Sequence, residues 1–215
     1  MKKILELNKL IKEYNLDAYI VPKNDEFFAE YAFPNRLKTI SNFSGSAGFA
    51  IITKSLNYLF VDGRYLIQSK IESGKNFKII EIPYTYPKDI LDINKIQKIG
   101  YDPKLFTNST LERYFSKKFQ LISINKNLID LIYLKKIKKN NIFFKLEDKI
   151  VGETVSSKIN RLYKIIKKKN TYNLFVSAPE NVAWLLNIRG KDNPNSPIPN
   201  ARLIIDKEKK IYFFS

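Results

Sequence analysis

The segment GSAGFAIIT at residues 45–53, followed by FVDGRY at residues 60–65, decides how this chain is expected to fold. The apolar runs 49–53 and 58–61 are separated by the short segment KSLN, so they most simply form a β-hairpin. Because glycine tolerates positive φ, the two glycines of GSAG predict a tight turn before a buried strand. The turn is not a phosphate-binding loop, since it lacks the G-x-G-x-x-G spacing and a Gly-Lys-Ser/Thr ending.

Helices and strands are expected to alternate on both sides of this hairpin. The other predicted strands of this part are 16–21, 77–82, 98–102 and 121–124. The predicted helices are 2–14, 65–73 and 110–119. The helix at 65–73 is predicted from the helical spacing of Tyr65, Ile67 and Ile71, and it is expected to end at Gly74. This alternation predicts an α/β domain over residues 1–130, with a mixed or parallel sheet flanked by helices.

The second part of the chain is predicted at residues 151–215, after a connector at 131–150 that holds the basic run KKIKK. Its predicted elements repeat the order of the first part: helix 153–168, strand 174–177, helix 181–187, and strands 201–205 and 210–214. Trp184 lies in an apolar run of the second helix and is expected in the core. We therefore expect a partial second domain of related fold.

The charge balance, 38 Lys and Arg against 21 Asp and Glu, gives a net charge of +17 that would attract polyanions. A free-standing lysine-rich module that binds RNA or another polyanion is therefore an alternative function, with the run 135–139 as its binding surface. Only six of the basic residues are arginine, although the guanidinium is the preferred group for reading bases and phosphates. A solvated lysine surface is thus the favoured interpretation, and nucleic acid is the disfavoured partner.

The sequence contains no histidine and no cysteine. The usual proton shuttle, a thiol nucleophile and the nitrogen and sulfur ligands of metals are therefore excluded, and so is a disulfide. No catalytic residue and no metal ligand is predicted, and the acidic pair Glu26 and Glu30 is interpreted as surface. The start of the chain lacks the apolar core of a signal peptide, and no stretch approaches the roughly 20 apolar residues of a membrane span. We expect a cytoplasmic protein without a membrane segment.

Asp62 and Arg64 form the candidate polar site. A carboxylate and a guanidinium this close together at a strand end can pair, or the arginine can be presented to a ligand carboxylate. Asp62 can also cap the helix that follows. Both alternatives stay open, because Asp62 can cap the helix while Arg64 points outward.

In their order and spacing, the motifs of this chain resemble the N-terminal half of aminopeptidase P, the Xaa-Pro aminopeptidase of the creatinase and prolidase superfamily. The resemblance covers nearly the whole chain. Its motifs are AYIVP (18–22), Asp25-Glu26, Glu30-Tyr31, Arg36-Leu37, NFSGSAG (42–48), DGRY (62–65), Gln68, GYDP (100–103), NLID (127–130), AWLLNIRG (183–190) and Asp192. The family usually has a histidine two residues after Asp25. Here that position is Phe27, so any polar role there is lost.

The resemblance implies a three-domain enzyme in which two N-terminal domains of creatinase/prolidase type precede a C-terminal pita-bread metallopeptidase domain. The catalytic domain, with two divalent metal ions expected to be manganese, is absent from this sequence, so no cofactor is expected in the chain.

The chain would be inactive alone, would contribute dimer contacts, and would shape the substrate cleft for peptides with proline at the second position. By resemblance, Arg64 reaches that cleft with Asp62 and Tyr65 in support, and Arg189 makes an interdomain contact. The expected partners are the metallopeptidase domain, in cis or as a separate chain, and a second copy in a homodimer.

Overall fold

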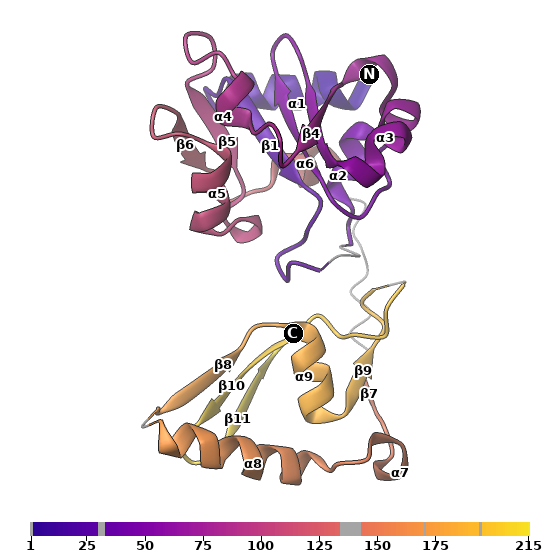
Figure 1. Cartoon of the computed structure of the whole chain (residues 1–215), viewed down its shortest axis with the longest axis vertical. Coiled ribbons are helices and arrows are strands. Elements are labelled where there is room, and N and C mark those ends of the chain that lie inside the picture. Colours follow the sequence, from indigo (N-terminus) through magenta and orange to yellow (C-terminus); the bar gives the residue numbers. More distant parts are fainter. Residues whose placement is uncertain (1, 30–32, 134–142, 170, 194) are drawn as a thin grey trace. The chain divides into compact units, whose positions relative to one another are not determined.

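The structure is a computed structural model that describes residues 2–29, 33–133, 143–169, 171–193 and 195–215. The chain folds into two compact units, Met1–Ile137 (unit 1) and Lys138–Ser215 (unit 2). Each unit has its own sheet and core (Figure 1). Within the described ranges, no helix is both long and apolar enough to span a membrane.

Unit 1 is built on a six-stranded sheet with the order β4-β3-β2-β1-β5-β6. The strands are β1 (Ala18–Pro22), β2 (Phe49–Thr53), β3 (Tyr58–Asp62), β4 (Lys78–Ile82), β5 (Lys98–Tyr101) and β6 (Gln120–Ser123). β2 pairs antiparallel with β1 and β3, whereas β3 with β4, β1 with β5 and β5 with β6 pair in parallel. The predicted mixed sheet and the predicted β2-β3 hairpin are therefore confirmed.

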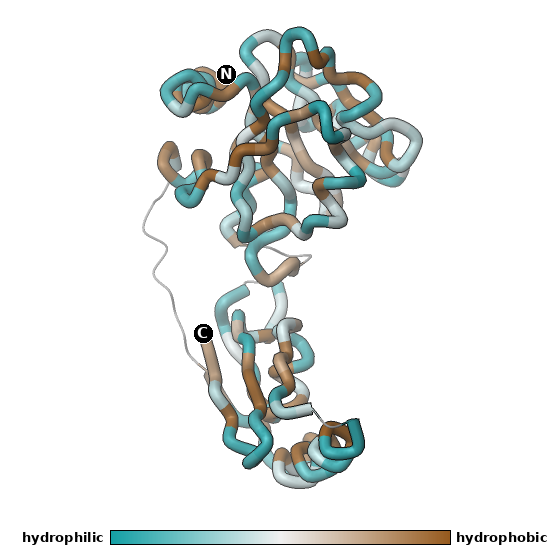
Figure 2. The backbone as a smooth tube through the Cα atoms, turned by 90° about the vertical axis from the view of Figure 1, so that its left-hand side faces the viewer, coloured by the Kyte–Doolittle hydropathy of each residue, from teal (hydrophilic) through white to brown (hydrophobic). Residues whose placement is uncertain are grey.

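Helices cover both faces of this sheet. One core contains apolar residues of α1 (Lys2–Glu13), α2 (Arg36–Ser41), α3 (Leu66–Ser73) and α6 (Leu128–Tyr133). The other contains residues of α4 (Pro87–Ile90) and α5 (Asn108–Tyr114). Short 3-10 turns follow β3, α3 and β5 at Gly63–Tyr65, Gly74–Asn76 and Pro103–Leu105. The sheet is therefore buried on both faces, and many apolar stretches recur along the tube of unit 1 (Figure 2).

One prediction about a helix in unit 1 is wrong. The helix predicted at 110–119 ends at Tyr114, because Phe115 turns to an extended conformation (φ −124°, ψ 145°), and Phe115 and Phe119 pack into the core. The helix predicted at 65–73 is confirmed as α3, which ends before Gly74. Of the residues whose spacing predicted it, Tyr65 packs against the core, whereas Ile67 and Ile71 are each 77% exposed. The helices α2 and α6 lie where none was predicted.

Unit 2 has a three-stranded antiparallel sheet with the order β11-β10-β8, formed by β8 (Asn173–Val176), β10 (Arg202–Asp206) and β11 (Ile211–Phe214). A separate pair joins β7 (Phe143–Lys145) to β9 (Ile188–Gly190). The helices are α7 (Asp148–Val151), α8 (Val155–Lys168) and α9 (Pro179–Leu186). Apolar residues of α8, α9 and β10 form the core. The antiparallel order β8-β10-β11 repeats that of β1-β2-β3, as the predicted repeat of elements requires.

The predicted connector at 131–150 contains the end of α6, β7 and most of α7, and its basic run 135–139 lies outside the described residues. The domain limits 1–130 and 151–215 stay predictions.

Trp184 corrects another prediction, because it is 52% exposed rather than part of the core. Its neighbours Val182, Ala183 and Leu185 occupy the buried face of α9. The indole ring instead covers Lys158, whose Nζ lies 4.3 Å from the ring centre. Lys158 is buried and donates hydrogen bonds of 2.6 Å to the Trp184 carbonyl and to Asn187 Oδ1. Trp184 thus closes a polar contact between α8 and α9.

Candidate functional site

The direction of the strands gathers the sequence motifs at one edge of the unit 1 sheet. Because β1, β3, β4, β5 and β6 run in the same direction, their carboxyl ends lie at a common edge, and the antiparallel β2 begins there. We call it the carboxyl edge. It holds Asp25 after β1, the DGRY segment after β3, Asp102 after β5 and the GSAG loop before β2. Open α/β sheets usually bind ligands at the carboxyl ends of their strands.

Three aspartates close three of these strand ends with the same turn. Asp25, Asp62 and Asp102 each use Oδ1 to accept the backbone N–H two residues further on. The distances are 2.9 Å to Phe27 N, 3.0 Å to Arg64 N and 3.0 Å to Lys104 N. Such bonds satisfy N–H groups that a strand end leaves without a ladder partner. These aspartates therefore act first as turn formers.

Asp62 also pairs with Arg64. Arg64 Nε and Nη2 lie 3.1 and 2.7 Å from Asp62 Oδ1 and Oδ2, and this bidentate pair lowers the pKa of Asp62. Both geometries predicted for Asp62, the cap and the ion pair, are thus present. The Arg64 side chain is 72% exposed, and its guanidinium lies 5.2 Å from the ring centre of Tyr65. The carboxylate of Asp62 and the ring of Tyr65 therefore hold the exposed Arg64 side chain in place.

Tyr65 connects the DGRY segment to the GSAG loop. Its hydroxyl lies 2.8 Å from Ser46 Oγ, and its ring meets Phe43 edge to face at 5.6 Å. Gly48 adopts a φ of +147°, and a Cβ there would lie 2.6 Å from the Phe60 carbonyl oxygen. The positive φ predicted for the glycines of GSAG is thus confirmed at Gly48 but not at Gly45.

A second set of bonds ties the same loop to α3. Ser44 donates from its backbone N and its Oγ to the Glu72 carboxylate, each at 2.6 Å, and Gln68 Nε2 bonds to both Ser44 Oγ and Glu72 at 3.0 Å. Burial alone would raise the pKa of Glu72, but these bonds outweigh it and lower that pKa. The loop, the turn and α3 are therefore held as one piece.

Two other motifs of the chain meet in a structural contact. Arg36 Nε and Nη2 each lie 2.7 Å from an oxygen of Asp130, 94 positions later in the sequence. Asn127 donates to Asp102 Oδ2 at 3.0 Å and accepts from the Ile129 N–H at 3.0 Å. These bonds fix α6 against α2 and the end of β5.

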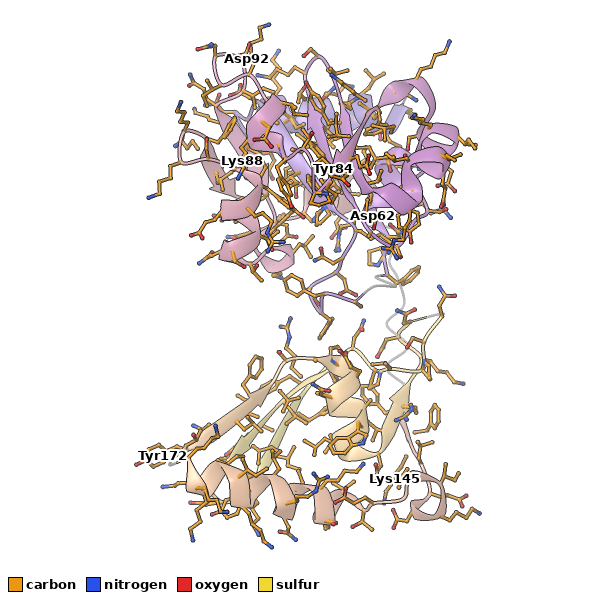
Figure 3. All side chains as sticks on the ribbon, viewed as in Figure 1. Asp62, Tyr84, Lys88, Asp92, Lys145 and Tyr172 are labelled. Carbon is orange, nitrogen blue, oxygen red and sulfur yellow. The ribbon has the colours of Figure 1, made fainter. Side chains whose placement is uncertain are left out.

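Tyr84 and Arg189 lie outside the segment 62–65. Tyr84 is 82% exposed and follows β4 two residues after Ile82, which pairs with Asp62 (Figure 3). Arg189 belongs to β9 of unit 2 and donates from Nη1 to the Ile188 carbonyl at 2.8 Å. Its interdomain role stays a prediction, as does the cleft role of Arg64, Asp62 and Tyr65. Sequence reasoning missed the shared edge, although an aspartate after each of three strands was a visible signal.

The carboxyl edge does not fit a metal ion. In the described part of the chain, no three histidine, cysteine, aspartate or glutamate side chains come together as a possible metal site. The strand-end aspartates already accept backbone N–H bonds, and two of them are also engaged by Arg64 or Asn127.

Comparison with known proteins accounts for the whole chain. Residues 3–131 and residues 134–215 each match a family described as the creatinase/prolidase N-terminal domain. The chain is 33% identical to Xaa-Pro aminopeptidase 1 of Dictyostelium discoideum, over 99% of this chain and 37% of that protein. It is 31% identical to a Laccaria bicolor protein named Probable Xaa-Pro aminopeptidase P, over 99% of this chain and 35% of that protein.

A solved structure agrees with these relatives. The X-prolyl aminopeptidase of Caenorhabditis elegans, described as a cytosolic enzyme with a di-nuclear active site, matches with a TM-score of 0.84 and 26% identity. The match covers 99% of this chain and 38% of that one, so the chain spans little more than a third of the length of these proteins. The chain therefore belongs to the creatinase/prolidase N-terminal domain family and corresponds to the N-terminal portion of the Xaa-Pro aminopeptidases.

Proposed function

We propose that this chain is the non-catalytic front part of an Xaa-Pro aminopeptidase, which acts in the cytoplasm together with a metallopeptidase portion in cis or as a separate chain. The observation that carries the proposal is the match of the whole chain to a little over a third of such enzymes. The lack of histidine and cysteine in the sequence supports it, because hydrolysis by bound metal ions commonly relies on such ligands. The two metal ions, which we expect to be manganese, would then belong to the other portion.

Within that function, the carboxyl edge of unit 1 narrows the entrance to the substrate cleft. Arg64 suits this role because Asp62 and Tyr65 hold it in place while most of its side chain stays exposed. A guanidinium held in this way can meet a carboxylate of a peptide whose second residue is proline. Arg189 of unit 2 would contact another domain, and unit 1 or unit 2 would add contacts in a dimer.

Unit 2 supports the view that its domain continues in the other portion. In unit 1 the strands β1 and β3 have outer partners, β5 and β4, whereas in the described part of unit 2 the corresponding strands β8 and β11 have none. Its outer sheet face carries Phe175, Tyr212 and Phe214, which are 57%, 41% and 52% exposed. Strands and helices from the other portion would pair with these edges and cover this face.

The test is reconstitution. The chain is mixed with the part of the Dictyostelium enzyme that lies outside the match, and release of the first residue from an Xaa-Pro peptide is measured with manganese. We expect no cleavage by the chain alone and an increase when both are present. Metal-stimulated cleavage by the purified chain alone would overturn the proposal, and so would the absence of any association between the two pieces.

Within the reconstituted pair, Arg64→Ala should raise KM more than it lowers kcat, because the proposed role of Arg64 is binding at the cleft entrance. Arg113→Ala, at a basic residue of α5, is the matched control. Equal kinetics for both variants would remove Arg64 from the cleft.

A further inference from the structure

Helix α3 carries apolar residues on two sides, because Leu66 packs against the core while two isoleucines face solvent. Its two serines, Ser69 and Ser73, are buried at 0% and 3% exposure, while Ile67 and Ile71 on the opposite side are each 77% exposed. A helix that only covers a sheet places its apolar stripe against the core and its polar stripe in water. Small serines let α3 lie close to the sheet, but they do not explain two isoleucines one turn apart in solvent.

These isoleucines form a defined surface, which we call the α3 ridge. Arg64 precedes Ile67 by three residues and Ile71 follows by four, so the ridge continues the face that begins at the carboxyl edge. Lys70 and Lys75 are exposed beside it. Ser44 holds the other flank through Gln68 and Glu72, so the ridge is presented on a fixed helix.

The size of the ridge limits what can occupy it. Two isoleucine side chains expose on the order of 200 Å² of apolar surface, whereas a stable interface between separate proteins buries about 800 Å² on each partner. The ridge is therefore suited to one part of a larger interface, such as a contact between portions of one enzyme.

The charges around the ridge indicate which kind of surface can bind to it. A second copy of this chain would bring the same lysines and the same net charge of +17 to the contact, and like charges would repel. A surface with apolar residues and an acidic rim would be attracted. The relatives carry nearly two thirds of their length outside the match, so they have a further portion that can supply such a surface.

We propose that the α3 ridge is the surface through which unit 1 docks on the metallopeptidase portion, against an apolar patch with an acidic rim. This inference rests on the proposed function and specifies where the contact lies. The docking would set the position of Arg64 relative to the cleft, because Arg64 lies at the start of the same face.

Binding of the full chain to the remaining part of the Dictyostelium enzyme tests the proposal. Ile67→Lys/Ile71→Lys should weaken the affinity at least about tenfold, because the apolar contact is lost. Lys70→Glu/Lys75→Glu should weaken it as well and reduce its dependence on salt. Leu5→Lys on α1, where the leucine is 58% exposed, is the matched control and should stay within about twofold. Since all of these positions are exposed, the urea midpoint of each variant should match that of the unmodified chain.

The outcomes separate this inference from the proposed function. If the unmodified chain binds and the isoleucine variant binds equally well, the ridge is not the docking surface, but the proposed function stands. If the isoleucine variant instead abolishes self-association in sedimentation velocity, the occupant is a second copy and the inference is wrong. If the unmodified chain does not bind at all, the proposed function fails and this inference fails with it.

Discussion

Replacing Asp130 with alanine should destabilise unit 1 by about 2–3 kcal/mol. Asp130 accepts two charge-assisted hydrogen bonds of 2.7 Å from Arg36, and the two side chains are only 22% and 15% exposed. Exposed pairs contribute about 0.2–1 kcal/mol, and breaking a fully buried pair costs about 3–5 kcal/mol. The partial exposure of this pair places it between these limits, because water can reach the guanidinium that remains.

Urea unfolding followed by circular dichroism measures this effect. For a unit of this size, the expected loss in the free energy of unfolding lowers the urea midpoint by roughly 1 M. Burial alone would lower the pKa of Arg36, but Asp130 outweighs it and raises that pKa. Because a guanidinium is not deprotonated in proteins, Arg36 stays charged when Asp130 is removed and loses the partner that offsets its burial. The double variant Arg36→Met/Asp130→Leu should recover most of the stability, because no uncompensated charge is left.

Two results would refute the reasoning. A loss below about 0.5 kcal/mol for Asp130→Ala would show that the pair behaves as a solvated surface contact. A double variant as unstable as the single one would show that the loss arises from packing of α6 rather than from charge. The emission of Trp184, in unit 2, gives an internal reference, because a change confined to unit 1 should leave it unaltered.

Four further outcomes are expected. Gly48→Ala should cost more than about 2 kcal/mol in urea unfolding, because φ is +147° and a backbone oxygen lies 2.6 Å from the new Cβ. Gly152→Ala, in the left-handed region (φ +71°, ψ −27°) and with open space, should cost about 1 kcal/mol, and equal losses would contradict the steric argument.

Burial alone would raise the pKa of Asp17, but hydrogen bonds from backbone N–H groups outweigh it and lower that pKa in the folded chain. The contribution of Asp17 to stability is therefore present above about pH 4 and is lost as the pH falls through the folded-state pKa. Asp17→Asn should flatten acid unfolding in this range, and an unchanged pH profile would count against that assignment. Lys158→Met should destabilise unit 2 by about 1–3 kcal/mol and shift the emission of Trp184, because two buried acceptors lose their donor. Amides of unit 2 should exchange faster than those of unit 1, because its small sheet has open edges in the described residues, and equal protection would show that unit 2 is self-sufficient.

The sequence predicted the sheet better than the helices, for a physical reason. The strands of unit 1 are short apolar runs between turn residues, and their pattern is local. The helices α2 and α6 have six residues each, too few for a periodic pattern to emerge. In α3 the spacing of Ile67 and Ile71 was identified, but spacing does not say which stripe faces the sheet when serines fill the close contact.

The prediction that Trp184 lies in the core was wrong for a similar reason. All residues around it in 182–186 are apolar, so no periodicity separates the buried face from the exposed one. Its position follows from Lys158, a residue 26 positions earlier that donates to the Trp184 carbonyl. A contact of this range is decided by the packing of α8 on α9 and leaves no local signal.

For the candidate site, the sequence offered the pairing of Asp62 with Arg64 as one of two alternatives, but it did not predict where in the fold this pair lies. The carboxyl edge arises from parallel pairing of β3 with β4 and of β1 with β5, and such long-range pairing is not encoded in adjacent residues. The three aspartates at the strand ends share a turn that could have been recognised, since each follows an apolar run.

The motifs that identify the family therefore divide by what their side chains do. The polar groups of Asp25, Asp102 and the Arg36–Asp130 pair are engaged in the turns and helices of unit 1, so these residues act on the fold. Arg64 differs, because its ion pair and its aromatic neighbour hold it at the surface rather than in the core. Any contribution of this chain to peptide recognition should consequently lie at Arg64 and along the helix that follows it, where variants alter binding without altering stability.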